Sequence, residues 1–372
     1  MIYIFSILLA LSQIVIFPML SFRWAKEITF QVLIMLTMCH FIWNKNKWLA
    51  SFIMWSLFLF FLGKNFRIND YNYPISYNVN PIALFNIINI VLIGVFYTVL
   101  HKMNLDKKIL YKTLCFVALF QGVYAILQKF GIDQFFLHIT GQFGPVERWP
   151  VGSWANEALC SWCIALCSPF FLAFKELRFK IGYVVCFCAI LCMGCSAAIV
   201  GFVLGFLFWL WHKNWKLALA IILIVATIGG TLLLNGKLGY YLQDTHRFKV
   251  WAKAIEIWKE RPITGWGVGS FRSLFWQRAM EFFKDGQWAQ AHNEYLQVLF
   301  EEGIIGLGIV FGFIFTIGLS FFRKRQGIIP LTCLIVAGFI SIFSFPLHTS
   351  MGAIIILALV LYEREIHGFS LD

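Results

Sequence analysis

Charged side chains are scarce in this chain: Asp, Glu, Lys and Arg together make up 13% of its 372 residues, and only 18 residues are acidic. Hydrophobic residues account for 60% of the chain, and its mean hydropathy is +0.78. A soluble domain does not need so much apolar surface, because a single hydrophobic core stops growing well before this size. The composition therefore excludes an ordinary soluble domain and predicts an all-α, polytopic integral membrane protein.

Apolar runs long enough to cross a bilayer recur along the whole chain. Since a helix needs about 20 mostly apolar residues to span the hydrocarbon core, we expect about twelve transmembrane helices. The first run lacks a basic flank and a clear cleavage site, so we expect a retained span rather than a signal peptide. The expected spans are 2–20, 28–43, 48–62, 82–100, 109–127, 158–174, 181–195, 197–211, 217–234, 304–322, 328–345 and 351–362. The expected organisation is N-terminal helices 1–127, central helices 128–234, a hydrophilic loop 235–303 and C-terminal helices 304–372.

Lysine and arginine gather in every second loop between the expected spans. Placing these loops and both termini in the cytoplasm puts the long hydrophilic loop on the other side, the periplasm of a Gram-negative cell. That loop nevertheless has more basic than acidic residues; the arginines among them are Arg247, Arg261, Arg272 and Arg278. Positive charge on this side favours an anionic ligand, and attraction to acidic lipid head groups is the alternative.

The hydrophilic loop contains no cysteine, so it offers no disulfide framework. Six cysteines of the central helices lie within expected spans and are predicted to share two helical faces: Cys160, Cys163 and Cys167 on one, and Cys188, Cys192 and Cys195 on the other. Small residues that let helices pack closely explain these groups better than a metal site, which needs a closed cluster with polar support. We expect no metal and no cofactor. A basic stripe with interleaved aromatic residues is also lacking, so we expect no nucleic-acid partner.

An amphipathic helix is predicted within the hydrophilic loop over residues 246–260, ended by Pro262. Its apolar positions are Phe248, Trp251, Ile255 and Trp258. A helix of this kind is suited to lie in the membrane interface, with tryptophans at the depth of the lipid head groups.

A glycine-rich turn follows, with Gly265, Gly267 and Gly269. Glycines allow backbone N–H groups to approach a phosphate, but this spacing does not match a dinucleotide fingerprint. A structural turn is the simpler interpretation.

The most distinctive polar motif is the pair His292-Asn293, which precedes Gly303 and Gly306 at the start of an apolar span. A histidine at the boundary between water and lipid titrates near neutral pH and is able to take a proton from a hydroxyl. The neighbouring Glu294 either orients this histidine or faces water.

Another polar group starts an earlier span. Asn156 lies at the expected start of the sixth span, and Arg148 lies nearby as a possible anion contact. Capping of a helix explains Asn156 without any ligand.

Several of these stretches together resemble the bacterial O-antigen ligase and O-antigen polymerase superfamily. They are Arg247-Phe-Lys-Val-Trp251, Arg261-Pro-Ile-Thr-Gly-Trp-Gly-Val-Gly-Ser-Phe271, His292-Asn293 with Gly303-Ile-Ile-Gly306, Gly152-Ser-Trp-Ala-Asn156 and Phe345-Pro-Leu-His348. The resemblance extends from about Trp149 to Tyr362, and the His-Asn motif is its most specific part. It implies a glycosyltransferase of the bacterial inner membrane whose active site faces the periplasm.

Members of this superfamily take a glycan from undecaprenyl pyrophosphate. Ligases pass it to the lipid A-core, and polymerases pass it to a growing glycan. By this resemblance His292 is the general base and Arg247 binds the pyrophosphate, while Asn156 and Asn293 are candidate substrate contacts. The glycines 265, 267, 269, 303 and 306 form the structural part of the motifs.

One departure from the family pattern concerns the turn between the expected spans 181–195 and 197–211. Many members carry a Ser-Arg pair there, whereas this chain has Cys195-Ser-Ala-Ala198. Arg148, Arg272 and Arg278 are candidates for the missing phosphate contact, and the departure weakens the ligase interpretation relative to the polymerase. A transporter is the alternative from another class. Transporters place paired ionisable residues or broken helices near mid-membrane. In this chain the expected spans are almost free of charge and the polar residues concentrate in the hydrophilic loop, which favours chemistry at the interface.

Overall fold

The computed structural model describes Ala10 and residues 106–132, 150–154, 156–234, 245–267, 270–279, 288, 290–324, 327–346, 349 and 351–366. These residues form helices, turns and loops, and no strand occurs among them. The all-α prediction is therefore confirmed over this part of the chain. The expected spans 2–20, 28–43, 48–62 and 82–100 lie outside the described residues apart from Ala10, so the expected number of spans stays a prediction.

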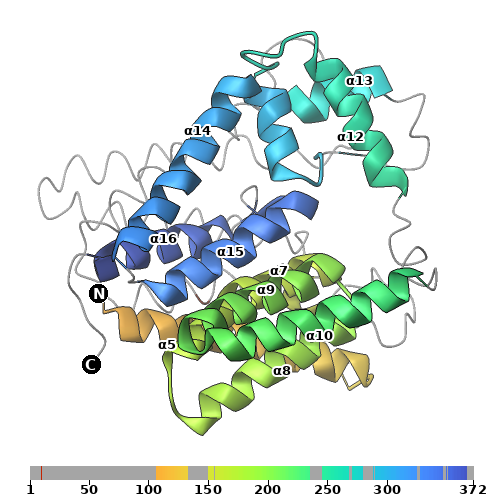
Figure 1. Ribbon diagram of the computed structural model, residues 1–372. Helices are drawn as coiled ribbons and strands as arrows, with labels where there is room; N and C mark the ends of the chain where they lie inside the picture. Colours follow the sequence, from red (N-terminus) through yellow and green to blue (C-terminus); the bar gives the residue numbers. More distant parts are fainter. Residues whose placement is uncertain are drawn as a thin grey trace, which may run out of the picture.

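Most of the described helices form one bundle (Figure 1). The bundle comprises α5 (Lys107–Lys129), α7 (Glu157–Cys167), α8 (Leu177–Met193), α9 (Ser196–Lys213), α10 (Trp215–Leu234), α15 (Ile328–Phe343) and α16 (Gly352–Ile366). A 3-10 turn over Ser168–Ala173 continues α7, where Pro169 follows its last residue. Every span predicted between residues 109 and 362 is thus helical over most of its length.

Three helices in the described part are long and apolar enough to cross a membrane. They are Lys107–Lys129, Ser196–Lys213 and Glu294–Leu319, the last within α14 (Glu294–Lys324). The apolar side chains of α14 beyond residue 303 are largely exposed, with Ile309 at 69% and Phe315 at 65%. Such exposure is costly in water and natural in lipid. The composition of these helices supports a membrane protein.

Small residues let the central helices of the bundle approach one another closely. On α9, a Cβ added at Gly201 would touch Ile340 of α15, and one at Gly205 would overlap with Val336. Four residues forward on α9 thus correspond to four residues backward on α15, so the two helices run antiparallel. Cys160, Cys163 and Cys167 of α7 are fully buried in this core, as small residues should be.

The second predicted cysteine group needs a correction. Cys188 is exposed and Cys192 is half-buried, while Cys195 lies in the turn between α8 and α9. The chain leaves the helix at Gly194, which adopts the left-handed conformation (φ +71°) that glycine allows at a helix end. Cys195 therefore does not continue a helical face with the other two cysteines.

The two ends of the bundle differ in charge. One end carries the start of α7, the turn between α8 and α9 and the end of α15. The opposite end carries the basic residues Lys107, Lys108, Lys175, Arg178, Lys180, Lys213 and Lys216. This distribution is the one that the positive-inside rule associates with a cytoplasmic face.

The remaining elements form a small head next to the end of the bundle without these basic residues (Figure 1). The head comprises α12 (Thr245–Trp258), a π-helix over Phe271–Phe275, α13 (Trp276–Ala279) and the first two turns of α14. Its core consists of Val250, Ala254, Ile257, Phe271, Phe275, Ala279, Ala291, Leu296 and Phe300. The head thus has a hydrophobic core of its own.

The amphipathic helix predicted over residues 246–260 is confirmed as α12, and its contact with the membrane interface stays a prediction. The face that packs on the head consists of residues other than the predicted apolar stripe. Val250, Ala254 and Ile257 are buried, whereas Phe248 is 58% exposed and Ile255 is 38% exposed. The predicted stripe consists of the largest apolar residues of the helix. The helix instead turns its smaller residues onto the closely packed head.

Helix α14 is broken at Gly303, which has φ +69° and ψ −165°. Along a straight helix the 16 steps from Tyr295 to Phe311 would span about 24 Å. The rings of Tyr295 and Phe311 instead stack with their centroids 5.5 Å apart. The segment before Gly303 therefore folds back along the segment after it, and Tyr295 also donates a hydrogen bond to the Gly338 carbonyl on α15 (2.9 Å).

The loop after α12 closes this break by exchanging backbone hydrogen bonds with it. Beyond Gly303, the N–H groups of Ile304 and Ile305 donate to the carbonyls of Pro262 and Ile263 (2.9 and 3.4 Å). Before Gly303, the carbonyls of Phe300 and Glu301 accept from the N–H groups of Trp266 and Gly267 (3.0 and 2.7 Å). Buried backbone groups need such partners, so the loop replaces the bonds that the break removes.

We expect Gly303→Ala to destabilise the protein by about 2 kcal/mol or more, because alanine is strained at φ +69° and its Cβ would overlap with the Ile263 carbonyl. Thermal unfolding of the purified protein in detergent, followed by tryptophan fluorescence, measures this loss. The matched control is Gly308→Ala on the same helix, where a Cβ meets no atom within 4 Å. An equal unfolding temperature for Gly303→Ala and the wild type would contradict the proposed packing of the break.

Candidate functional site

His292 lies between two aromatic rings at the place where the head meets the bundle. Its ring makes edge contacts with Trp288 (centroids 5.3 Å apart) and with Phe345 after α15 (4.9 Å). Phe345 in turn contacts Trp162 of α7 edge to face (5.6 Å). The histidine is half-buried. It therefore sits at the end of the membrane bundle, held by aromatic contacts from both parts of the molecule.

The backbone of His292 is unusual. With φ +51°, it is the single non-glycine residue with positive φ in the described part of the chain. Histidine tolerates the left-handed region better than most residues, yet the conformation still costs free energy. Such a conformation persists where surrounding contacts impose it, and it is found at functional sites more often than elsewhere.

Arg247 reaches the same place from the first turn of α12. Its guanidinium donates a hydrogen bond to the carbonyl of Phe343, the last residue of α15 (3.2 Å). Phe345, which touches the His292 ring, follows two residues later. The structure therefore places at one end of the bundle the two residues to which the family resemblance gives the main chemical roles.

The turn between α8 and α9 lies at the same end of the bundle as Arg247. Burial raises the pKa of the Cys195 thiol in this turn above its usual value, and the positive charge of Arg247 is among the groups that act in the opposite direction. This is the turn in which the family pattern has a Ser-Arg pair that the chain lacks.

Both asparagines predicted as substrate contacts cap helices. The Asn156 side-chain oxygen accepts from the Leu159 N–H at the start of α7 (2.9 Å), and that of Asn293 accepts from the Leu296 N–H at the start of α14 (2.9 Å). Each cap satisfies a backbone donor that has no partner within its helix. A substrate contact by either side chain stays a prediction.

Glu294 is buried, with 2% of its surface exposed, so it does not face water. Of the two interpretations of this residue, burial beside the histidine favours the one in which it orients the site.

Two glutamines of α5 hold the segment that precedes α7. Gln121 bonds both the N–H and the hydroxyl of Ser153 (3.0 and 2.7 Å). The Gln128 oxygen accepts from the N–H groups of Val151 and Gly152 (2.9 and 2.7 Å). All these groups are buried, where unpaired polar atoms are costly. The motif Gly152-Ser-Trp thus has a fixed backbone at the site end of the bundle.

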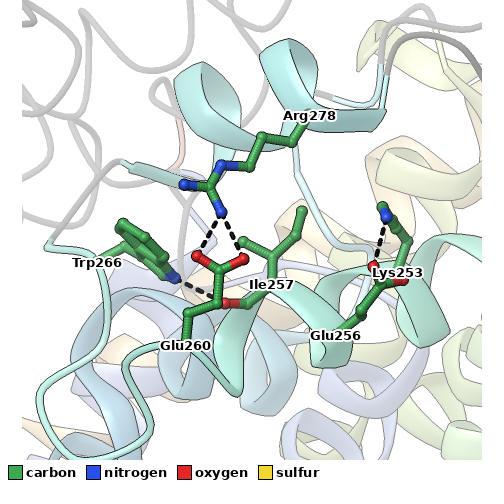
Figure 2. A network of polar contacts seen from close by, with 6 residues as sticks. All are labelled: Lys253, Glu256, Ile257, Glu260, Trp266 and Arg278. Atoms are coloured by element: carbon green, nitrogen blue, oxygen red, sulfur yellow. Dashed lines mark hydrogen bonds and ion pairs between the residues drawn. The ribbon is translucent and has the colours of Figure 1, made fainter.

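Arg278 of α13 is engaged within the protein (Figure 2). Its guanidinium donates to both carboxylate oxygens of Glu260 (2.6 Å each) and lies 4.8 Å from the centre of the Trp266 ring. The guanidinium of Arg261 also lies over this ring, 4.4 Å from its centre. The Trp266 indole also donates to the Ile257 carbonyl (3.0 Å). These contacts join α13 to the loop after α12, and an anion contact by Arg278 stays a prediction.

The glycine-rich turn uses its backbone donors inside the protein. Gly265 (φ +66°) packs against the backbone of Glu301 and Gly303, where a Cβ would not fit. The N–H groups of Trp266 and Gly267 donate to α14, so they do not point toward a phosphate. Gly306 is buried on α14 just beyond the break. Arg148, Gly269 and the side chain of Arg272 lie outside the described residues.

The site also contains residues that the sequence does not single out. Phe343 supplies a carbonyl. Trp162 and Trp288 are the two ends of a row of ring contacts that runs through Phe345 and His292. Nothing in the spacing of aromatic residues marks these among the 18% that the chain contains. Among the described residues, no group of three or more His, Cys, Asp and Glu side chains is placed to hold a metal ion.

Comparison with known families agrees with the motifs. A family model described as O-antigen ligase matches residues 181–311, about a third of the chain, which include α8, α9, α12, the glycine-rich turn and His292. No curated protein matches the chain. The match and the apolar helices together support a membrane enzyme of the O-antigen ligase or polymerase type. The match over residues 181–311 agrees with the resemblance to the O-antigen ligase superfamily that the sequence motifs predict.

Proposed function

We propose that the protein is a glycosyltransferase that moves a glycan from undecaprenyl pyrophosphate to an acceptor hydroxyl at the periplasmic face of the inner membrane. The acceptor is the lipid A-core, as in O-antigen ligases. The observation that carries this proposal is the meeting of His292 and Arg247 at the end of α15, through Phe345 and Phe343.

His292 is the general base of the proposed reaction. The acceptor oxygen forms a bond with the anomeric carbon of the glycan, and the bond from that carbon to the pyrophosphate breaks. His292 takes the proton of the acceptor hydroxyl as the new bond forms. A positioned base contributes about 10²–10⁴ in rate. The half-buried ring, with aromatic neighbours on two sides, is held in place for such a transfer.

Arg247 binds the pyrophosphate of the donor and of the leaving group. Guanidinium forms paired hydrogen bonds with phosphate oxygens, and it keeps its charge at any relevant pH. In the structure this side chain already points at the bundle end, where it bonds a backbone carbonyl. Since negative charge grows on the pyrophosphate as the sugar leaves, a fixed cation here stabilises the transition state.

The position of the site supports a periplasmic location. His292, Arg247 and the caps of α7 and α14 gather at the end of the bundle opposite the loops rich in lysine and arginine. A carrier lipid would thus present its head group at the site while its chain remains in the membrane.

The alternative is an O-antigen or polysaccharide polymerase on the same scaffold, with a growing glycan as acceptor. The missing Ser-Arg pair near Cys195 weakens the ligase interpretation relative to this alternative. A transporter is the third candidate. The buried Glu301 of α14 bonds within the head rather than lining a path through the bundle, which favours chemistry at the interface.

We expect His292→Ala to abolish glycan transfer while the protein still accumulates in the membrane. Complementation of a strain that lacks its own copy, with glycan profiles read on a gel, measures this. His212→Ala is the matched control, because His212 is exposed at the opposite end of the bundle. Unattached carrier-linked chains in the mutant would indicate a ligase, and caps of a single repeat a polymerase. Normal glycans in the His292→Ala strain would refute the proposed base.

We expect Arg247→Lys to raise KM for the lipid-linked donor about tenfold, since lysine cannot form the paired contact with phosphate. Initial rates with the purified protein over a range of donor concentrations measure this effect. Lys253→Ala is the control on the same helix: it removes a cation that forms an ion pair with Glu256 (2.7 Å; Figure 2). An unchanged KM in Arg247→Lys would contradict the pyrophosphate role.

A further inference from the structure

We propose that Trp251 and Gln297 are positioning residues, which hold the backbone on both sides of Ala291 and thereby keep His292 in its left-handed conformation. This inference rests on the proposed role of His292 as the base. Neither residue needs to touch the substrate. Both act through the peptide groups next to the histidine.

The two peptide groups of Ala291 are each held by a side chain. The Trp251 indole N–H donates to the Ala291 carbonyl (2.8 Å), which belongs to the peptide that leads into His292. The Ala291 N–H, in the preceding peptide, donates to the Gln297 side-chain oxygen (3.2 Å). Ala291 itself is fully buried. Rotation of either peptide would break a buried hydrogen bond, so the chain enters His292 in a single direction.

The conformation of His292 needs this support. Histidine by itself favours negative φ, so without support from its neighbours His292 would leave its φ of +51°. Such a rotation would move the imidazole out of its place between Trp288 and Phe345. Beyond His292, the Asn293 cap fixes the start of α14. The strained residue is thus held from both sides.

Gln297 is itself oriented by a buried carboxylate. Its side-chain N–H donates to Glu301 (3.3 Å), one turn further along α14, so its oxygen faces the Ala291 N–H. Glu301 also accepts from the Phe271 N–H at the start of the π-helix (3.3 Å). Gln297 and Glu301 are both buried, at 3% and 4% exposure. The position of His292 therefore depends on a polar network that reaches across the head.

Trp251 couples the base to the pyrophosphate site. It follows Arg247 by four residues on α12, so the two side chains lie on the same face of one helix. The Trp251 ring also contacts Phe343 (centroids 6.3 Å apart), whose carbonyl binds Arg247. A single rigid element thus sets both the proposed phosphate contact and the backbone that presents the base.

The test is Trp251→Phe, which keeps an aromatic ring and removes the N–H. With the purified full chain, an undecaprenyl-pyrophosphate-linked glycan and a lipid A-core acceptor, we expect kcat to fall about tenfold with little change in KM, because one buried hydrogen bond is lost from a strained backbone. Trp258→Phe is the matched control: it lies on the same helix and its indole also bonds a carbonyl, that of Pro262 (3.2 Å). Equal kcat in Trp251→Phe and the wild type would overturn the proposal.

A readout without glycan transfer separates this proposal from the proposed function. The rate at which diethyl pyrocarbonate modifies His292, followed by mass spectrometry across pH, reports the surroundings of the ring. We expect Trp251→Phe to change this rate several-fold and Trp258→Phe to leave it unchanged. If the wild type transfers no glycan while the rate still changes, the positioning stands and the proposed chemistry is wrong. An unchanged rate in Trp251→Phe refutes the positioning.

Gln297→Met supplies a second variant of similar size that removes the acceptor of the Ala291 N–H. Both side chains hold the same residue. We therefore expect the loss of kcat in the double variant Trp251→Phe/Gln297→Met to be close to the larger of the two single losses. Thermal unfolding confirms that each variant is folded. Losses that multiply in the double variant would show that the two residues act independently and would overturn the proposal.

Discussion

The exchange of backbone hydrogen bonds at Gly303 is the constraint on which the rest of the site depends. At the break in α14, the loop after α12 provides partners for two N–H groups and two carbonyls of the helix. Only glycine fits where the two segments of the backbone approach each other, at Gly303 and at Gly265 opposite it. The glycine motifs of the two segments are therefore two halves of one contact. Their spacing reflects the packing of backbone against backbone rather than a cradle for phosphate.

The break also determines where His292 lies. A straight α14 would carry the residues before Gly303 away from the bundle, about 1.5 Å for each residue. Because the chain folds back instead, the start of α14 returns along its own apolar segment to α15, where Tyr295 bonds the Gly338 carbonyl. His292 therefore reaches Phe345 at the end of the bundle. Arg247 arrives at the same place because α12 packs its small residues against this folded-back segment.

Much of this arrangement could be predicted from the sequence. Apolar runs predicted the bundle helices, and the period of α12 with Pro262 behind it predicted that helix. The resemblance to the O-antigen ligase superfamily implied His292 and Arg247 as residues of one site. The buried face of α12 could not be predicted in this way, because the large residues Phe248 and Ile255 dominate the pattern while the small Ala254 makes the contact. The folding back at Gly303 could not be predicted either, since a glycine in an apolar run is equally compatible with a continuous helix. The roles of Gln297 and Glu301 depend on that fold, and therefore on contacts with residues far away in the chain.

The central claim is that His292 and Arg247 form one site at the end of the bundle. A cryo-EM structure of the purified protein in lipid nanodiscs with undecaprenyl pyrophosphate tests it most directly. We expect the diphosphate to contact the Arg247 guanidinium, with the His292 ring facing the adjacent space and the isoprenoid chain extending toward the membrane. A diphosphate bound at Arg261 and Arg278 around Trp266, with Arg247 still bonded to Phe343, would contradict the account.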